Sequence, residues 1–170
     1  MRDASEREYV DYVTARIPTL RRLAYLLAGD EHRADDLVQQ TITTLYVKWR
    51  RAQAADHIDA YVRTMLVRTY LDERRLAWAR VRLFQRAPEP EPAEDHGIED
   101  RQVVRAELAR VPRQQRAVLV LRFFYDLPVD EVARILGCSS GTVKSQTSRG
   151  LATLRRLLDE RGFVRHPALN

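Results

Sequence analysis

The sequence predicts an all-α protein made of two small helical domains joined by a flexible acidic Pro/Glu linker. Apolar residues recur at helical spacing through most of the chain, and no useful length of apolar/polar alternation favours a strand. A chain of 170 residues with 45% hydrophobic residues has room for two small domains. Residues 86–100, RAPEPEPAEDHGIED, alternate proline with glutamate, which disfavours helices and sheet ladders alike. We therefore expect a first domain over residues 1–83, a linker over 84–99, a second domain over 100–160 and a tail over 161–170.

Composition limits the classes of function. The formal net charge of +5 comes mostly from arginine, which pairs well with phosphate and favours a nucleic-acid partner. A single cysteine, Cys138, excludes an internal disulfide and a thiolate zinc cluster, and we expect it to pack rather than to react. The N-terminus lacks the apolar stretch of a signal peptide, and no apolar run approaches the roughly 20 residues of a membrane span. These features predict a cytoplasmic protein.

The residues of a catalytic site are missing from the sequence. There is no Gly-rich phosphate loop, and no histidines are paired at ligand spacing. The four histidines are dispersed: His32, His57, His96 and His166. We expect no enzymatic activity, no metal and no cofactor.

The first domain is predicted to begin with two helices. Residues 11–30 are helical in pattern, with a break near Pro18 and an end at Gly29, after which Asp30 caps the next helix. Residues 33–51, RADDLVQQTITTLYVKWRR, form a long amphipathic helix. Its expected core positions are Leu37, Val38, Ile42, Leu45, Tyr46 and Trp49.

A polar cluster lies near the start of this second helix, formed by Asp35, Asp36, Gln39 and Gln40. Carboxylates here complement the helix dipole, so the residues alone favour a solvated surface. A docking face for a partner helix is the alternative.

The third helix is predicted from Asp59 onward, in DAYVRTMLVRTYLDERRLAWARVR. Its expected core side consists of Val62, Met65, Leu66 and Thr69. The arginines left outside are Arg63, Arg68, Arg74, Arg75 and Arg80, interleaved with Tyr61, Tyr70 and Trp78. Cations for phosphates and aromatic rings for unstacked bases are the ingredients of single-strand binding. A solvated basic face with its aromatic side chains in the core explains the same pattern.

The second domain is predicted to contain a helix-turn-helix. A helix over 100–111 ends before Pro112, and a strongly apolar helix follows. In LPVDEVARILG, Pro128 fits a first helical turn and Gly137 fits a left-handed helix end. After the turn, Ser140 is the expected N-cap of the last helix.

The last helix, in GCSSGTVKSQTSRGLATLRRL, has two different faces. An expected core stripe consists of Val143, Thr147, Leu151, Leu154 and Leu158. The other face carries Thr142, Lys144, Ser145, Gln146, Ser148 and Arg149, side chains that bond to base edges and phosphates. We expect this helix to lie in a DNA major groove, although a helix-turn-helix without DNA binding would share the pattern.

The ordered set of segments resembles the extracytoplasmic-function (ECF) sigma factors of the sigma-70 family, and within them an actinobacterial sigma-E-like group. GDEHRADDLVQQTITTLYVKW resembles the polymerase-binding part of region 2, and AYVRTMLVRTYLDERR its promoter-melting part. The stretch from VPRQQRAVLVLRFFYD to GTVKSQTSRGLATLRR resembles region 4. The resemblance spans residues 8–158 and implies a region 2 helical bundle and a region 4 helix-turn-helix.

The resemblance also implies partners and site residues. RNA polymerase core would bind through its largest-subunit clamp coiled coil and its second-largest-subunit flap, and the polar cluster, Asp35, Asp36, Gln39 and Gln40, would meet the clamp. Promoter DNA would be read at the minus-ten element by Tyr61, Arg63, Arg68, Asp72, Arg74 and Arg75. The minus-thirty-five element would be read by Thr142, Lys144, Ser145, Gln146 and Arg149. An anti-sigma factor, which holds many family members inactive, is a further implied partner.

Two departures from the family pattern bear on specificity. Gln40 stands where many relatives have glutamate, and Gln146-Thr147-Ser148 replaces a commoner sequence in the last helix. The resemblance therefore implies a promoter reader without naming its bases. A helix-turn-helix regulator that binds a symmetric operator by itself is the rival interpretation.

Overall fold

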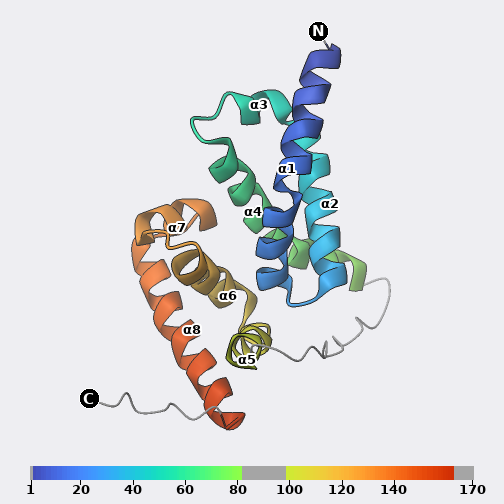
Figure 1. Ribbon diagram of the computed structural model, residues 1–170. Coiled ribbons are helices and arrows are strands. Elements are labelled where there is room, and N and C mark those ends of the chain that lie inside the picture. The colour runs from blue at the N-terminus through green and yellow to red at the C-terminus, as the bar shows by residue number, and fades with distance from the viewer. Residues whose placement is uncertain (1, 82–98, 163–170) are drawn as a thin grey trace, which may run out of the picture. The chain divides into compact units, whose positions relative to one another are not determined.

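The structure is a computed structural model that describes residues 2–81 and 99–162. It divides into two compact units, residues 1–91 and 92–170, and every element in its described ranges is a helix (Figure 1). The predicted all-α fold with two helical domains is confirmed. Most of the expected linker, residues 84–98, and the tail beyond Gly162 lie outside the described residues.

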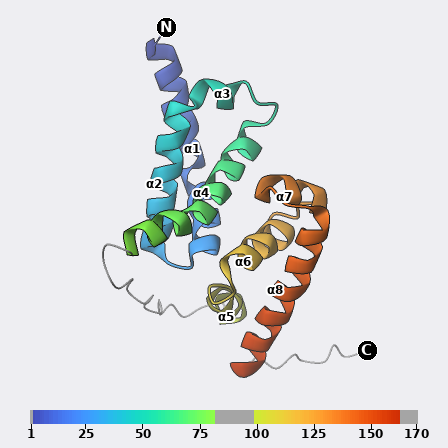
Figure 2. The same cartoon turned by 180° about the vertical axis from the view of Figure 1, so that it is seen from behind.

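The first unit is a helical bundle. It consists of α1 (Arg2–Ala28), α2 (Glu31–Val47), the short α3 (Trp49–Gln53) and α4 (Ile58–Val81). α1 packs along α2, and both contact α4, as the views from both sides show (Figures 1 and 2). The core between them is aliphatic with one tyrosine, and its fully buried side chains include Leu27, Leu37, Leu45, Leu66 and Tyr70.

The break expected near Pro18 is wrong, because α1 runs through this residue without interruption. A proline inside a helix removes one hydrogen bond and costs about 3 kcal/mol. Its ring lies on the exposed side of α1, whereas Val13, Leu20 and Leu23 are buried on the other side. Packing of this apolar stripe outweighs the local cost.

The junction between α1 and α2 follows the sequence prediction. Gly29 has a φ of 73°, the left-handed conformation that ends a helix. The Asp30 side chain then accepts a hydrogen bond from the backbone N–H of Arg33 at 2.9 Å, which caps α2.

The helix predicted over residues 33–51 is divided in two. α2 ends at Val47, the chain turns at Lys48, and α3 follows. Trp49 is buried as expected, but Tyr46 is 56% exposed. Its ring meets the edge of Tyr9 at a centroid distance of 5.1 Å instead of entering the core.

The second unit is built around its last helix. It contains α5 (Glu99–Leu108), α6 (Arg113–Leu119), a π-helical turn η1 (Val120–Phe124), α7 (Val129–Leu136) and α8 (Ser140–Glu160). α8 contacts α5, α6 and α7 (Figure 2). The apolar core includes Leu108, Val118, Leu121, Val132 and Val143.

The buried stripe of α8 differs from the predicted one. Its buried positions are Val143, Gly150 and Leu157, seven residues apart, while Leu151 is 37% exposed and Leu158 is half-buried. A Cβ atom at position 150 would lie 3.1 Å from Leu119 Cγ, so glycine allows α8 to approach α6 closely. Hydrophobic periodicity missed this position because glycine carries no side chain.

A buried carboxylate holds the far end of α8. Glu107 in α5, 2% exposed, pairs with Arg161 at 2.7 Å and with Arg110 at 2.8 Å. Because Arg161 follows the last residue of α8, this contact fixes that end of the helix against α5.

Candidate nucleic-acid interface

The helix-turn-helix consists of α7, a three-residue turn and α8. Gly137 ends α7 with a φ of 66°, and the backbone N–H of Cys138 donates to the carbonyl of Ala133 at 3.1 Å. Ala133 and Val143 are buried where the two helices meet, as the sequence predicts. The turn therefore fixes where α8 begins.

The N-cap of α8 is Ser139, and the prediction of Ser140 is wrong by one residue. Ser139 Oγ accepts a hydrogen bond from the backbone N–H of Thr142 at 3.1 Å and lies 2.9 Å from Thr142 Oγ1. Ser140 is the first helical residue, and its hydroxyl donates to Asp130 Oδ1 at 2.7 Å. The two adjacent serines have the same side chain, and the backbone distinguishes them: Ser139 is extended, with a φ of −78° and a ψ of 157°, whereas α8 begins at Ser140.

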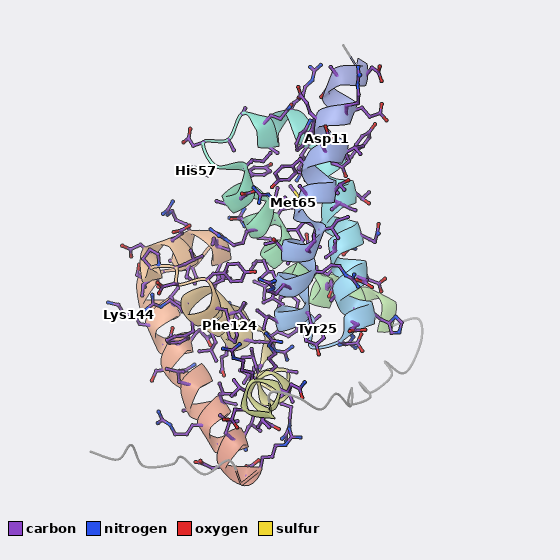
Figure 3. All side chains as sticks on the ribbon, viewed as in Figure 1. Asp11, Tyr25, His57, Met65, Phe124 and Lys144 are labelled. Carbon is purple, nitrogen blue, oxygen red and sulfur yellow. The ribbon has the colours of Figure 1, made fainter. Side chains whose placement is uncertain are left out.

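The five residues predicted to read the upstream element all lie in the first half of α8. Lys144, Ser145 and Arg149 are exposed, whereas Thr142 and Gln146 are half-buried. Figure 3 shows Lys144 on the outer side of α8. Among the residues the structure describes, Lys144 and Arg149 form no ion pair, which leaves both cations available to phosphates or base edges.

The Ser145 hydroxyl has a defined hydrogen-bond direction. It donates to the backbone carbonyl of Thr142 at 3.0 Å, so its remaining capacity is that of an acceptor. An acceptor in the major groove pairs with the amino groups of adenine or cytosine.

The centre of the outer face of α8 is lined by small residues, of which the site prediction included only Ser145. By helical register, Gly141, Ser145, Ser148 and Ala152 form one exposed line. Lys144 and Arg155 lie along one side of this line, and Arg149 and Arg156 along the other. Small side chains allow a helix backbone to approach a groove floor closely. Of the flanking cations, Arg156 is paired with Glu160 at 2.6 Å. Helical periodicity already places Ser148 on this face, and the same spacing could have found Arg155 and Arg156.

The residues predicted to read the downstream element all belong to α4, but they divide by helical register. Tyr61, Arg68, Asp72 and Arg75 fall on one side, whereas Arg63 and Arg74 fall on the other. Arg68 and Asp72 are exposed, and Tyr61 and Arg63 are half-buried. Positions 74 and 75 belong to α4, and their side chains lie outside the described residues.

The structure decides between the two interpretations of one aromatic residue on α4. Tyr70 is fully buried, so it belongs to the core and cannot stack on a base. Trp78 and Arg80 belong to α4, and their side chains are not among those described.

A polar contact holds the start of α4, next to the loop between α3 and α4 in which His57 lies (Figure 3). Asp59 accepts a hydrogen bond from the Tyr12 hydroxyl at 2.8 Å and pairs with Arg16 at 2.8 Å. Burial raises the pKa of Tyr12, and the bond to the Asp59 carboxylate raises this pKa further. The contact connects α1 to the first turn of α4.

The polar cluster of α2 lies on the surface of the first unit. Asp36, Gln39 and Gln40 are exposed, and Asp35 is engaged by Arg21 through contacts of 2.8 and 3.3 Å. By helical register, Thr43 and Val47 continue the line of Asp36 and Gln40 along α2. Val47 is 80% exposed, so this outer face of α2, here called the α2 face, ends in an apolar side chain that the sequence prediction missed.

Other classes of site find no support in the described residues. They contain no group of three or more His, Cys, Asp or Glu side chains placed to hold a metal ion. No helix within these ranges is both long and apolar enough to cross a membrane.

Comparisons with known proteins identify both units. Residues 12–80 match the family model of sigma-70 region 2, and residues 101–154 match that of sigma-70 region 4. The RNA polymerase sigma-E factor of Streptomyces coelicolor is 34% identical over 169 residues, which cover 93% of each chain. The ECF RNA polymerase sigma factor EcfG of Rhodopseudomonas palustris is 29% identical over 87% of this chain and 83% of its own.

Among solved structures, the sigma factor RpoE of Bartonella quintana, crystallised with the anti-sigma factor NepR, has the same fold. It superposes with a TM-score of 0.71 at 25% identity and covers 90% of this chain and 98% of its own. Both family matches occur in one chain, in the order that the sequence resemblance gave. The chain therefore belongs to the sigma-70 family, as an extracytoplasmic-function sigma factor that directs RNA polymerase to specific promoters.

Proposed function

We propose that this sigma factor acts in the cytoplasm without catalysis of its own, by two promoter-reading surfaces and one polymerase-docking surface. α8 reads the minus-thirty-five element, α4 holds bases of the minus-ten element, and the α2 face binds the clamp coiled coil of the largest polymerase subunit. The observation that carries the proposal is the outer face of α8. It combines Lys144 and Arg149, which form no ion pair with any residue that the structure describes, with a line of small residues, on a helix whose start is capped by Ser139.

At the upstream element, α8 lies in the major groove with its small-residue line toward the bases. Ser145 accepts from an exposed amino group, and Lys144 and Arg149 bind phosphates or guanine edges on either side. Thr142 and Gln146 are half-buried at the margin of this face, so they make peripheral contacts. Each bidentate contact to a base contributes about 1–3 kcal/mol of discrimination.

At the downstream element, α4 and the loop before it hold bases extruded from the non-template strand. Extrusion costs a few kcal/mol, which stacking and phosphate contacts must offset. Tyr61, Arg68 and Asp72 share one side of α4, and this side supplies the ring, the cation and the acceptor of a base pocket. Arg75 joins them by register, whereas Arg63 and Arg74 serve the strand backbone from the other side.

At the polymerase surface, the α2 face offers carboxylate, amide and apolar groups in succession. Asp36, Gln39 and Gln40 supply hydrogen-bond partners, and Val47 supplies an apolar contact at the far end. Arg21 holds the Asp35 carboxylate in one orientation before binding. The second unit binds the flap of the second-largest subunit, which brings α8 to the upstream DNA.

The domain boundaries proposed from the sequence complete this arrangement: region 2 over 1–83, a linker over 84–99, region 4 over 100–160 and a tail over 161–170. Family matches over residues 12–80 and 101–154 support it. Polymerase then acts as the scaffold on which two weak readers bind as one, so the free protein binds DNA poorly.

An anti-sigma factor is a further proposed partner. RpoE of Bartonella quintana, which shares this fold, was solved with the anti-sigma factor NepR. A protein of this class would keep the chain from the polymerase by covering the surfaces described above.

Run-off transcription tests the proposal. Purified actinobacterial core polymerase is combined with this protein and a pool of genomic promoter fragments. The double variant Lys144→Ala/Arg149→Ala serves beside the wild type, and core polymerase alone is the blank. We expect core-dependent transcripts from promoters that share two elements, and we expect the double variant to lose them.

Either of two results would reject the proposal. One is the absence of any core-dependent transcript together with tight binding of the lone protein to a palindromic site, which identifies a stand-alone regulator. The other is full activity of the double variant, which removes α8 from promoter reading.

A further inference from the structure

One hydrogen bond in the helix-turn-helix has no role in capping or in the core. The Ser140 hydroxyl donates to Asp130 Oδ1 at 2.7 Å, and the two residues are ten positions apart. Capping of α8 is supplied by Ser139, so the Ser140 hydroxyl is not needed for it. Asp130 is exposed and Ser140 is half-buried, so the bond contributes little buried surface.

The bond connects the beginnings of two helices. Asp130 lies in the first turn of α7, and Ser140 is the first residue of α8. Both helix starts carry partial positive charge, which favours the carboxylate at this place. A hydrogen bond to an ionised acceptor is shorter and stronger than a neutral one.

The geometry of the helix-turn-helix lets this bond affect the orientation of α8, the helix proposed to read DNA. The turn at Gly137 joins the end of α7 to α8, and the buried Ala133 and Val143 form the crossing point. The Asp130–Ser140 bond adds a polar attachment at the start of α8, whose middle packs on α6 at Gly150 and whose far end is held by the Glu107–Arg161 pair. Side chains that read bases must be held within about 0.5 Å and 10–20° of the productive geometry.

We infer that Asp130 and Ser140 are positioning residues that set the angle at which α8 enters the major groove, and thereby the base selectivity at the minus-thirty-five element. Neither residue belongs to the set proposed above to contact bases. The inference rests on the proposed reading of the upstream element by α8.

Holoenzyme reconstituted from full-length protein and core polymerase tests the inference. Promoters recovered with the wild type are randomised at the upstream element and, separately, at the downstream element, and the selected transcripts are sequenced. The variants are Ser140→Ala and Asp130→Ala, which remove the bond, and Ser140→Thr and Asp130→Asn, which keep a donor or an acceptor. The double variant Ser140→Ala/Asp130→Ala measures coupling.

We expect each alanine variant to lower upstream base preference by about 3- to 10-fold, the range of one lost hydrogen bond. Downstream preference should stay at the wild-type value, and the melting temperature should fall by no more than a few degrees, as expected for the loss of one exposed hydrogen bond. Ser140→Thr and Asp130→Asn should keep the upstream preference, and the double variant should resemble either single variant.

Several results would overturn the inference, each for a different reason. Unchanged upstream preference in both alanine variants, with an active wild type, shows that the bond does not position α8. Tighter upstream binding by both Asp130→Asn and Asp130→Ala shows that Asp130 acts only by repelling phosphate. Equal losses at both elements with a lower melting temperature show a purely structural role. An inactive wild type refutes the proposed function itself, and this inference with it.

Discussion

At the scale of single residues, the Tyr12 hydroxyl connects α1 to α4, and its pKa is raised in the folded state. Its hydroxyl donates to the carboxylate of Asp59, and the guanidinium of Arg16 lies 5.9 Å above its ring. Burial and the Asp59 carboxylate both raise the pKa of Tyr12 above 10.0, the ordinary value. Because the unfolded chain loses this proton first, the first unit should lose stability as the solution becomes alkaline.

The substitution Tyr12→Phe should distinguish the contribution of the Tyr12 hydroxyl to the alkaline loss of stability from the contributions of other titrating groups. In the wild type, the Tyr12 hydroxyl makes its full contribution to the free energy of unfolding below about pH 10. This contribution is lost as the pH rises toward the higher pKa of Tyr12 in the folded state. Tyr12→Phe should cost about 0.5–1.5 kcal/mol at neutral pH and then show a shallower alkaline decline. Urea unfolding followed by tryptophan fluorescence from about pH 8 to 11 measures both effects. An equal slope in the two proteins would contradict the assignment.

Ser145 and Lys144 are neighbours on α8 with different expected roles. The Ser145 acceptor should read a base, so Ser145→Ala should flatten preference at one upstream position and leave the salt dependence unchanged. The Lys144 cation should bind phosphate, so Lys144→Ala should weaken all sites alike and lower the salt slope by about 1. Holoenzyme affinity for promoter fragments over a range of salt concentrations measures both. If Ser145→Ala lowered the salt slope and Lys144→Ala flattened base preference at one position, the two roles would have to be exchanged.

At the scale of elements, the turn between α7 and α8 depends on one left-handed residue. Gly137 has a φ of 66°, and no atom lies within 4 Å of the place where its Cβ would be. The cost of a side chain there is therefore conformational rather than steric. Gly141, four residues later, lies inside the first turn of α8, and its Cβ would meet only Ser139 Oγ at 3.8 Å.

This pair of glycines gives a matched comparison. Gly137→Ala should lower the free energy of unfolding of the second unit by about 1 kcal/mol, because alanine is strained in the left-handed region. Gly141→Ala should raise it by about 0.5–1 kcal/mol, since glycine inside a helix has excess freedom when unfolded. Chemical denaturation of both variants provides the measurement. A loss of stability at both positions would show that close packing, and not backbone conformation, governs the turn.

On α2, Val47 tests whether the apolar end of the α2 face contributes to polymerase binding. Val47→Asp should weaken core binding by about 10-fold or more without loss of helix content, because the side chain is 80% exposed in the free protein. Val10→Asp on α1, where valine is 51% exposed, is the control and should bind as the wild type does. Titration of labelled core polymerase with each variant measures the affinity. Equal weakening by both variants would indicate an effect of charge on the whole unit.

The sequence was informative about elements because their ends carry local signals. Gly29, Asp30 and Gly137 each determine a helix end through their own backbone or side chain, and all three predictions are confirmed. Pro18 was misread because tertiary packing outweighed a local preference. Gly150 was missed because close approach of helices depends on a partner surface that no local pattern contains.

The candidate sites were harder to predict for a related reason. Carboxylates and amides on α2 look the same whether they face water or a partner, so periodicity alone favoured the solvated surface. Likewise, arginines and tyrosines spaced along α4 did not reveal that Tyr70 is buried. Resemblance to a family supplied the roles, and the register of α4 then divided the predicted residues between two sides.

At the scale of the whole molecule, the two units have separate cores. The first is closed by contacts among α1, α2 and α4, and the second by contacts of α8 with α5, α6 and α7. Each unit holds the helix proposed to read DNA by its own polar contacts, Asp59 with α1 in one and Asp130 with α8 in the other. We expect cooperation between the units in promoter reading to depend on the covalent connection and the polymerase.

Cleavage of that connection should leave both units folded and abolish most of the activity. Fragments 1–91 and 92–170 follow the division into compact units, and each should show helical circular dichroism and cooperative unfolding. When mixed with core polymerase at about 1 μM, they should transcribe about 10²- to 10³-fold less than the intact chain, since a short linker provides an effective concentration near 1 mM. Raising the second fragment toward millimolar concentration should restore transcription. Full activity at micromolar fragments would mean that polymerase binds each unit tightly alone and that the connection adds nothing, whereas fragments that fail to fold would show that the cores depend on each other.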